Sequence, residues 1–136
     1  MSKERRSQCP ISFTLDLVGD KWSLLILRDL MLFNKKYYGE FLNSRESIST
    51  NILADRLQRL ENSGLISKQK DEQDKKRLIY RPTEKGLDLL PLILEMVQWG
   101  VKYDMQTAAP LSEVKKMKKD REGYVKNIRK RFQCQK

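Results

Sequence analysis

The chain has 136 residues, of which 28 are Lys or Arg and 18 are Asp or Glu, so its formal net charge at pH 7 is +10. This length suits about one domain with a modest core, and the excess of cations favours a polyanionic partner. The sequence has no histidine, no glycine-rich phosphate loop and no nucleophile motif, so we expect neither an enzyme nor a bound cofactor.

The cysteines and the apolar segments indicate the compartment. Cys9 and Cys134 lie at opposite ends of the chain without metal-type spacing, so neither a disulfide scaffold nor a metal site is expected. The longest apolar region, 87–99, is interrupted by charged residues and falls short of the ~20 residues that span a bilayer. The N-terminus lacks the apolar segment and cleavage site of a signal peptide. We therefore expect a cytoplasmic protein that does not enter the membrane.

The first part of the chain predicts three helices in close succession. A short helix covers about 11–19, and Asp20 is a suitable N-cap for a second helix that runs to about Leu32. The second helix is apolar on two sides, which is usual for a central helix. After a turn at 34–36, the segment YYGEFLNS is long enough for one short helix.

The next helix, within STNILADRLQRLENSG, has an apolar stripe on one side only. Ser49 is a suitable N-cap, and Gly64 supplies a left-handed stop. The stripe consists of Leu53, Leu57 and Leu60. The opposite side carries short hydrogen-bonding groups flanked by cations, namely Asn51, Asp55, Gln58 and Asn62, with Arg56 and Arg59. Helices that need only solubility more often carry Glu and Lys pairs, so this side is a candidate binding surface, with a solvated surface as the alternative.

A β-hairpin is expected to follow this helix. Residues 65–70 and 78–81 have the composition of strands, and the polar loop between them ends with Lys75, Lys76 and Arg77. Helices in this order followed by a basic hairpin describe a winged helix-turn-helix. In that fold one helix enters the major groove of DNA, and the hairpin, called the wing, lies along the phosphates. The expected fold class is mainly α with a small β-hairpin.

The last third of the chain predicts two long helices. Thr83 can cap a helix that runs to about Tyr103 and bends near Pro91, and a last helix follows Pro110. Their apolar residues exceed what so small a domain can cover, so we expect both helices to take part in dimerisation. The expected layout is one domain, 1–136, with the helix-turn-helix at about 20–64, the wing at about 65–82 and dimerisation helices at about 11–19 and 83–133.

Charge is concentrated in the tail of the chain. Residues 111–136 hold ten cations against three acids. This tail could bind polyanions without regard to sequence, in which case deleting 115–136 would abolish binding. We favour the alternative, in which the tail is a helix with an apolar seam along one side and basic residues on the opposite, solvent-exposed side.

Six segments of the sequence match a known family in order and spacing. They are CPI at Cys9, LVGDKWSLLILRDL from Leu17, YYGEF from Tyr37, SISTNILADRLQRLENSGLI from Ser47, YRPTEKG from Tyr80 and LLPLILEMVQWG from Leu89. Together they resemble the HxlR-type winged-helix transcriptional regulators over Cys9 to about Gly100. The resemblance implies a homodimer that binds double-stranded DNA and regulates transcription, with the first and last helices pairing the subunits. A winged helix that binds a protein instead of DNA is the alternative.

The resemblance also implies the DNA-binding residues. They are Ser49, Thr50, Asn51, Asp55 and Arg56 in a recognition helix at 49–63, and Lys75, Lys76 and Arg77 in the wing. Asn51 is the best candidate for a base contact because an amide can form two hydrogen bonds with adenine, but it could also face solvent or cap the helix. Arg56 could bind a phosphate or pair with a carboxylate such as Asp55. The wing departs from the family pattern through its acids at 71, 72 and 74, so we expect phosphate contacts from its second half.

Cys9 is a candidate sensor of oxidants or electrophiles, and such a compound would be the effector. Arg5, Arg6 and the start of the first helix would each stabilise a thiolate, which is the reactive form. Some proteins that resemble this chain use the matching cysteine in this way. A small buried side chain without reactivity is the alternative.

Overall fold

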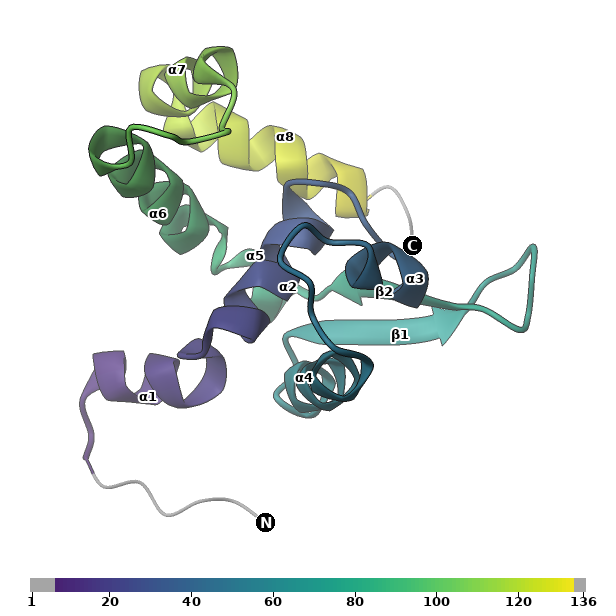
Figure 1. Ribbon diagram of the computed structural model, residues 1–136. Coiled ribbons are helices and arrows are strands. Elements are labelled where there is room, and N and C mark those ends of the chain that lie inside the picture. The colour runs from purple at the N-terminus through teal and green to yellow at the C-terminus, as the bar shows by residue number, and fades with distance from the viewer. Residues whose placement is uncertain (1–6, 134–136) are drawn as a thin grey trace.

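In the computed structural model, which describes residues 7–133, helices pack around an antiparallel hairpin (Figure 1). The elements are α1 Pro10–Val18, α2 Lys21–Met31, α3 Tyr38–Leu42, α4 Thr50–Asn62, β1 Ile66–Lys70, β2 Leu78–Pro82, α5 Glu84–Leu87, α6 Leu90–Tyr103, α7 Leu111–Lys119 and α8 Arg121–Gln133. The expected fold class, a mainly α winged helix-turn-helix with a small hairpin, is confirmed.

Helix α2 is the centre of the molecule. Its N-cap Asp20 accepts a hydrogen bond from the Ser23 N–H at 3.1 Å. Leu27, Leu30 and Met31 are completely buried, because α4 and the hairpin lie on one side of the helix and α6 lies on another (Figure 1). Both apolar sides of α2 that the sequence indicated are therefore buried by other elements of the same chain.

The wing is joined to the rest of the fold along both of its strands. In the hairpin, Ile66 pairs with Pro82 and Lys70 pairs with Leu78. A β-bridge between Tyr37 and Ile79 adds a short third segment beside β2. The left-handed conformation of Gly64, with φ 76°, ends α4 and turns the chain into β1.

The two long helices expected after Thr83 are each divided in two. Pro91 lacks an N–H and its ring would clash with the turn before it, so α5 ends at Leu87 and Pro91 lies in the first turn of α6. The helix is therefore interrupted, not merely bent as expected. The tail breaks at Asp120, whose carboxylate accepts a hydrogen bond from the Gly123 N–H at 3.0 Å and caps α8.

Helices α7 and α8 fold back onto α6 of the same chain. Val114 and Met117 of α7 and Ile128 of α8 are buried. Arg129 binds Glu84 and Asp88 of the α5 region, which ties α8 to the domain. The apolar seam of the tail is thus largely covered within one chain, and the dimerisation role expected for these helices stays a prediction. None of the helices described is long and apolar enough to cross a membrane.

Candidate nucleic-acid interface

Helix α4 is half buried and half open to solvent. Leu53, Leu57 and Leu60 are buried in the core, as their spacing predicted. The opposite side is exposed and includes Thr50, Asn51 and Asp55 in the first turns of the helix. The Ser49 hydroxyl accepts a hydrogen bond from the Ile52 N–H at 3.2 Å, so this side chain is occupied as the N-cap. The predicted recognition helix therefore presents polar side chains from its N-terminal half.

Arg56 is held by carboxylates. Its Nε donates to Asp20 Oδ2 at 2.8 Å, and the same guanidinium pairs with Asp55. Although partial burial opposes ionisation, hydrogen bonds from Ser23 and Arg56 lower the pKa of Asp20 to about 2. Of the two roles expected for Arg56, the structure has the carboxylate pair. This pair joins α4 to the start of α2.

Two tyrosines border α4 on the hairpin side. The Tyr38 hydroxyl donates to the Thr50 carbonyl oxygen at 3.1 Å, which fixes the start of α4 against α3. Tyr38 and Tyr80 line an open hollow of about 180 Å³ between α4 and the hairpin, together with Ala54, Leu57, Gln58, Glu61 and Lys68. The Glu61 carboxylate and the Lys68 ammonium, 3.5 Å apart, join the helix to β1 at this hollow. The helix and the hairpin are thus linked by side chains as well as by the short turn.

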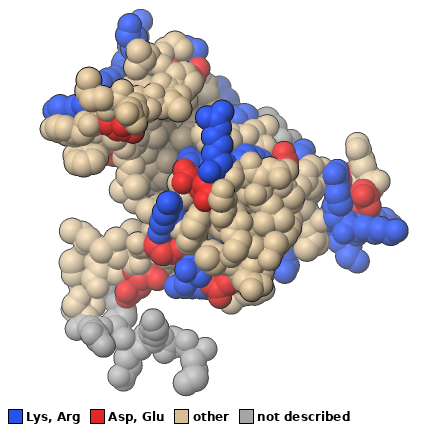
Figure 2. Space-filling model, in the orientation of Figure 1, with Lys and Arg blue, Asp and Glu red and all other residues tan. Residues whose placement is uncertain are grey.

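The loop of the wing carries the predicted basic residues at its tip, where Lys and Arg side chains gather in Figure 2. Lys75 and Lys76 are exposed, and neither ammonium has an ion-pair or hydrogen-bond partner within residues 7–133. Arg77 differs, because its Nη2 donates to Asp71 Oδ2 at 3.2 Å and its guanidinium lies 3.9 Å from the centre of the Tyr37 ring. The three basic residues are therefore not equivalent, and only the two lysines are unpaired in this part of the structure.

Asp71 and Tyr37 form a part of the site that the sequence analysis missed. Asp71 belongs to a loop that the sequence marks only as polar, yet it is buried and accepts a hydrogen bond from the Tyr37 hydroxyl at 3.0 Å. The hydrogen bond from the Gln73 N–H, more than any other contact, lowers the pKa of Asp71. Hydrogen bonding to Asp71 raises the pKa of Tyr37. This pair was not predictable from local sequence patterns, because 34 residues separate its members.

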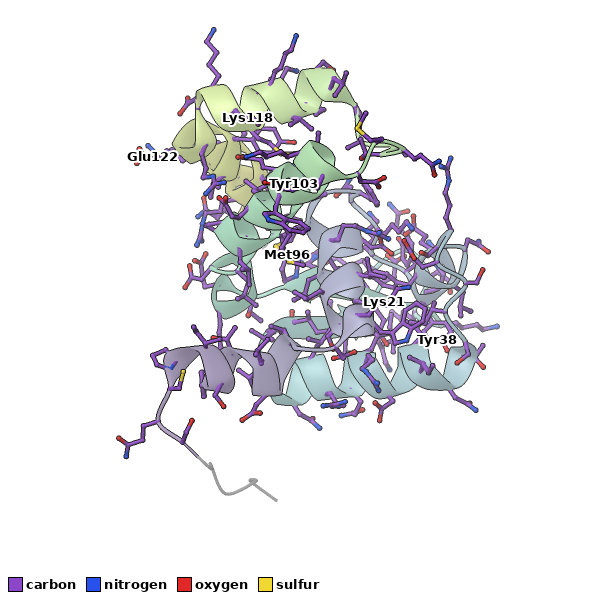
Figure 3. All side chains as sticks on the ribbon, turned by 60° about the vertical axis from the view of Figure 1, so that its left-hand side comes forward. Lys21, Tyr38, Met96, Tyr103, Lys118 and Glu122 are labelled. Atoms are coloured by element: carbon purple, nitrogen blue, oxygen red, sulfur yellow. The ribbon has the colours of Figure 1, made fainter. Side chains whose placement is uncertain are left out.

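A band of apolar side chains remains exposed on α6 and α1. Leu92, Met96, Trp99 and Tyr103 recur along one side of α6, and Trp99 is 66% exposed. Figure 3 shows Met96 and Tyr103 on the same side of this helix. The rings of Trp99 and Tyr103 lie 5.1 Å apart. These residues, with Ile11 and Leu15 of α1, are named here the apolar band.

Cys9 occupies the N-cap position of α1 and is exposed. Its N–H donates to the Ser7 hydroxyl at 3.3 Å. The alternative that Cys9 is a buried filler is therefore wrong. Arg5 and Arg6, which were expected to stabilise its thiolate, and Cys134 lie outside the described residues.

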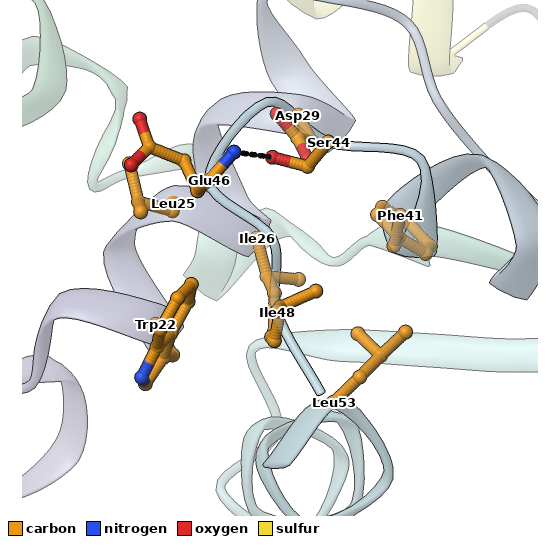
Figure 4. A pocket seen from close by; sticks show the side chains of 9 residues that line it. All are labelled: Trp22, Leu25, Ile26, Asp29, Phe41, Ser44, Glu46, Ile48 and Leu53. Carbon is orange, nitrogen blue, oxygen red and sulfur yellow. Dashed lines mark hydrogen bonds between the residues drawn. The ribbon is translucent and has the colours of Figure 1, made fainter. Parts of the chain in front are cut away.

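A second hollow, between α2 and the segment that leads to α4, is too small for an effector. Its volume is about 10 Å³, which is close to the space that one water molecule needs (Figure 4). Trp22, Ile26 and Leu53 are among its lining residues, and the Glu46 N–H donates to the Ser44 hydroxyl beside it at 3.2 Å. In residues 7–133, no group of three or more acidic or cysteine side chains is placed to hold a metal ion.

Comparison with known proteins identifies related regulators. A family model described as HxlR-like helix-turn-helix matches residues 17–108. YdeP, an uncharacterized HTH-type transcriptional regulator of Bacillus subtilis (strain 168), is 37% identical over 95 residues, which are 70% of this chain and 73% of YdeP. YybR of the same organism, also described as an uncharacterized HTH-type transcriptional regulator, is 35% identical over 92 residues, 68% of this chain and 73% of YybR.

Solved structures of transcriptional regulators are also similar to this chain. The redox regulator HypR in its oxidized form has a TM-score of 0.62 and 33% identity, covering 69% of this chain and 96% of HypR. The reduced form of the transcriptional regulator YodB from B. subtilis has a TM-score of 0.57 and 27% identity, covering 74% of this chain and 99% of YodB.

Proposed function

The chain belongs to the HxlR-like helix-turn-helix family of transcriptional regulators, and from this premise we propose that it binds double-stranded DNA sequence-specifically as a homodimer. In this proposal α4 enters the major groove and the wing lies on the DNA backbone. The observation that carries the proposal is the exposed polar side of α4, which is rigidly backed by buried leucines, together with two exposed lysines of the wing that have no partner within residues 7–133.

The N-terminal half of α4 supplies the base contacts in this proposal. Thr50, Asn51 and Asp55 are exposed there, and recognition helices read bases mainly with their N-terminal residues. Asn51 reads adenine through its amide. Arg56 contributes indirectly, because its ion pair with Asp20 holds α4 at a fixed angle to α2.

The wing supplies sequence-independent affinity through Lys75 and Lys76. Their ammonium groups are exposed and have no partner within residues 7–133, so binding a phosphate would cost no existing ion pair. Arg77 is already held by Asp71 and stacks on Tyr37, so we assign it to the support of the wing.

The apolar band supplies the dimer interface in this proposal. Helix α1 has nine residues and buries only Val18, and helices so short are marginal on their own in water. Exposed Ile11 and Leu15 on α1 and the exposed side of α6 would be covered by the same surfaces of a second copy. A two-fold dimer then presents two α4 helices to successive turns of one DNA face.

Cys9 is the proposed site at which an oxidant or electrophile would act. Its exposure gives such a compound access, and the similar protein HypR is described as a redox regulator. Because α1 is part of the proposed interface, modification at its first turn would tilt the subunits and move the two α4 helices apart. DNA affinity would fall while each subunit stayed folded.

Selection of binding sites from random double-stranded DNA tests this function. The wild type should enrich a two-fold symmetric motif. Asn51→Ala should flatten preference at the bases it reads, whereas Lys75→Ala should weaken all sequences alike and lower the salt dependence by about one unit of slope. Enrichment of no motif would contradict the proposal, and equal uniform losses in both variants would contradict the role of Asn51.

A further inference from the structure

The wing is anchored to a segment that is distant in sequence. The Tyr37 hydroxyl, just before α3, donates to Asp71 Oδ2 at 3.0 Å at the point where the chain leaves β1. Two backbone contacts align the same segments, namely the bridge from Tyr37 to Ile79 and the Tyr80 N–H, which donates to the Lys36 carbonyl at 2.8 Å. The base of the wing is therefore held from the side of α3 as well as by its own strands.

Asp71 connects this anchor to the rest of the loop. Its side chain accepts from the Gln73 N–H at 3.1 Å and from Arg77 Nη2 at 3.2 Å, in addition to Tyr37. The Asp71 N–H donates to the Arg77 carbonyl at 3.0 Å, which closes the loop at its base. The Asp71 side chain is only 8% exposed, and a carboxylate so buried is stable as an anion only while such donors surround it. Each donor therefore helps to hold one loop conformation.

The two lysines lie inside this closed loop. The Arg77 N–H donates to the Asp74 carbonyl at 2.9 Å, and the Lys76 N–H donates to the Asp74 carboxylate at 3.1 Å, so Lys75 and Lys76 stand on a tight turn. A further ion pair, between Arg77 Nε and Asp74 Oδ2 at 3.9 Å, also ties the turn to Arg77. Its direction therefore follows from the fixed positions of Asp71 and Arg77.

We propose that Tyr37 is a positioning residue for DNA binding, which directs the wing through Asp71 and Arg77 so that Lys75 and Lys76 reach the phosphates. This inference rests on the proposed function. Tyr37 itself touches no DNA in this scheme. It holds the Asp71 carboxylate by its hydroxyl and supports the Arg77 guanidinium, 3.9 Å away, by its ring.

The variant Tyr37→Phe tests the role of the hydroxyl, because it removes one hydrogen bond and keeps the ring and the net charge. Tyr124→Phe is a matched control, since the Tyr124 hydroxyl donates to Glu113 Oε2 at 3.0 Å in the α7–α8 region, away from the wing. The slope of log affinity against log salt concentration is measured on the selected DNA site. A neutral substitution can lower this slope only if charged groups elsewhere lose their phosphates.

Tyr37→Phe should lower the magnitude of the slope by about one to two, which corresponds to the contacts of two lysines. Tyr124→Phe should leave it unchanged. In the background Lys75→Ala with Lys76→Ala, Tyr37→Phe should cause no further change of slope. An unchanged slope in Tyr37→Phe, or a further loss in the lysine-free background, would overturn the proposal.

Hydrogen exchange without DNA separates this proposal from the proposed function. The amides of Asp71 and Gln73 should exchange faster in Tyr37→Phe than in the wild type, and at the wild-type rate in Tyr124→Phe. Unchanged exchange of both amides in Tyr37→Phe overturns the anchor whether or not the protein binds DNA. If exchange accelerates as expected but the wild type binds no DNA, the anchor stands as a structural feature, while the proposed function and the positioning role that rests on it both fail.

Discussion

The Arg56 guanidinium donates to the Asp20 carboxylate at 2.8 Å, which joins the second turn of α4 to the N-cap of α2. Asp20 also accepts from the Ser23 N–H at 3.1 Å. One carboxylate therefore caps the central helix and holds the exposed helix at a fixed angle to it. The local cap was predictable from the sequence, whereas the contact across 36 residues was not.

Asp20→Asn should reduce stability at pH 7 and make it less sensitive to acid. Because the pKa of Asp20 is lowered to about 2 in the folded protein, its carboxylate stabilises the fold above its unfolded pKa of about 3.9, and this contribution is lost as the pH falls toward 2. After a reduction for solvent screening, the loss in Asp20→Asn at pH 7 is about 1 to 2 kcal/mol. Urea unfolding at pH 7, 5, 3 and 2 measures it.

The difference between wild type and Asp20→Asn should narrow between pH 5 and pH 2. Asp16→Asn is the control, because Asp16 is exposed on α1 and has no side-chain partner among the described residues. A difference that stays constant down to pH 2, or equal losses in both variants, would show that the Asp20 contacts do not stabilise the fold as described.

Gly86→Ala should destabilise the protein because α5 approaches the hairpin closely. A Cβ at position 86 would lie 2.1 Å from the carbonyl oxygen of Leu65, a backbone atom that cannot move aside alone. We expect a loss of about 3 kcal/mol in the free energy of unfolding. Gly39→Ala, whose Cβ would meet nothing within 4 Å, should be neutral or stabilising by up to about 1 kcal/mol. Thermal unfolding showing equal stability of the two variants would refute the close packing.

Trp99→Ala should weaken dimerisation and leave the subunit folded. Trp99 is largely exposed in the single chain, so its removal takes little from the monomer core. In a dimer it would be a central aromatic residue, whose loss costs about 2 kcal/mol or a factor of about 30 in Kd. Sedimentation velocity across a range of concentrations measures the shift. Phe33→Ala removes an exposed aromatic residue outside the apolar band and should leave the dimer intact. If Phe33→Ala weakened dimerisation as much as Trp99→Ala, the apolar band would not be the interface.

Treatment with diamide or a quinone should lower DNA affinity in the wild type and not in Cys9→Ser. The reason is the exposed position of Cys9 at the start of α1, a helix of the proposed interface. Cys134→Ser is the control and should respond like the wild type. Circular dichroism should show that the treated protein remains folded. The proposal fails if binding is insensitive to both reagents, or if Cys9→Ser loses binding as the wild type does.

Local signals explain which parts of the structure were predictable. The N-caps Asp20 and Ser49 and the stop at Gly64 depend on neighbouring residues only, and all three occur as expected. The break at Asp120 was missed because the apolar stripe of the tail continues across it, although a capping carboxylate three residues before a glycine was visible. Pro91 was recognised, but its effect was underestimated.

Contacts between distant segments explain what the sequence could not supply. Arg77 and Asp71 looked like a free cation and a solvated acid, because the ring and hydroxyl of Tyr37 that bring them together come from another part of the chain. Charge by itself did not distinguish Arg77 from Lys75 and Lys76. Only the fold shows which cations are already paired.

The most direct test of sequence-specific binding by a pair of α4 helices is a hydroxyl-radical footprint on the selected DNA site. The wild type should protect two regions on one face of the duplex, with centres about one helical turn or ~34 Å apart, and the protection should be symmetric about the midpoint. Unrelated DNA of equal length at the same protein concentration should show no such pattern. A single protected region, or equal protection of both DNAs, would contradict a homodimer that reads sequence with α4.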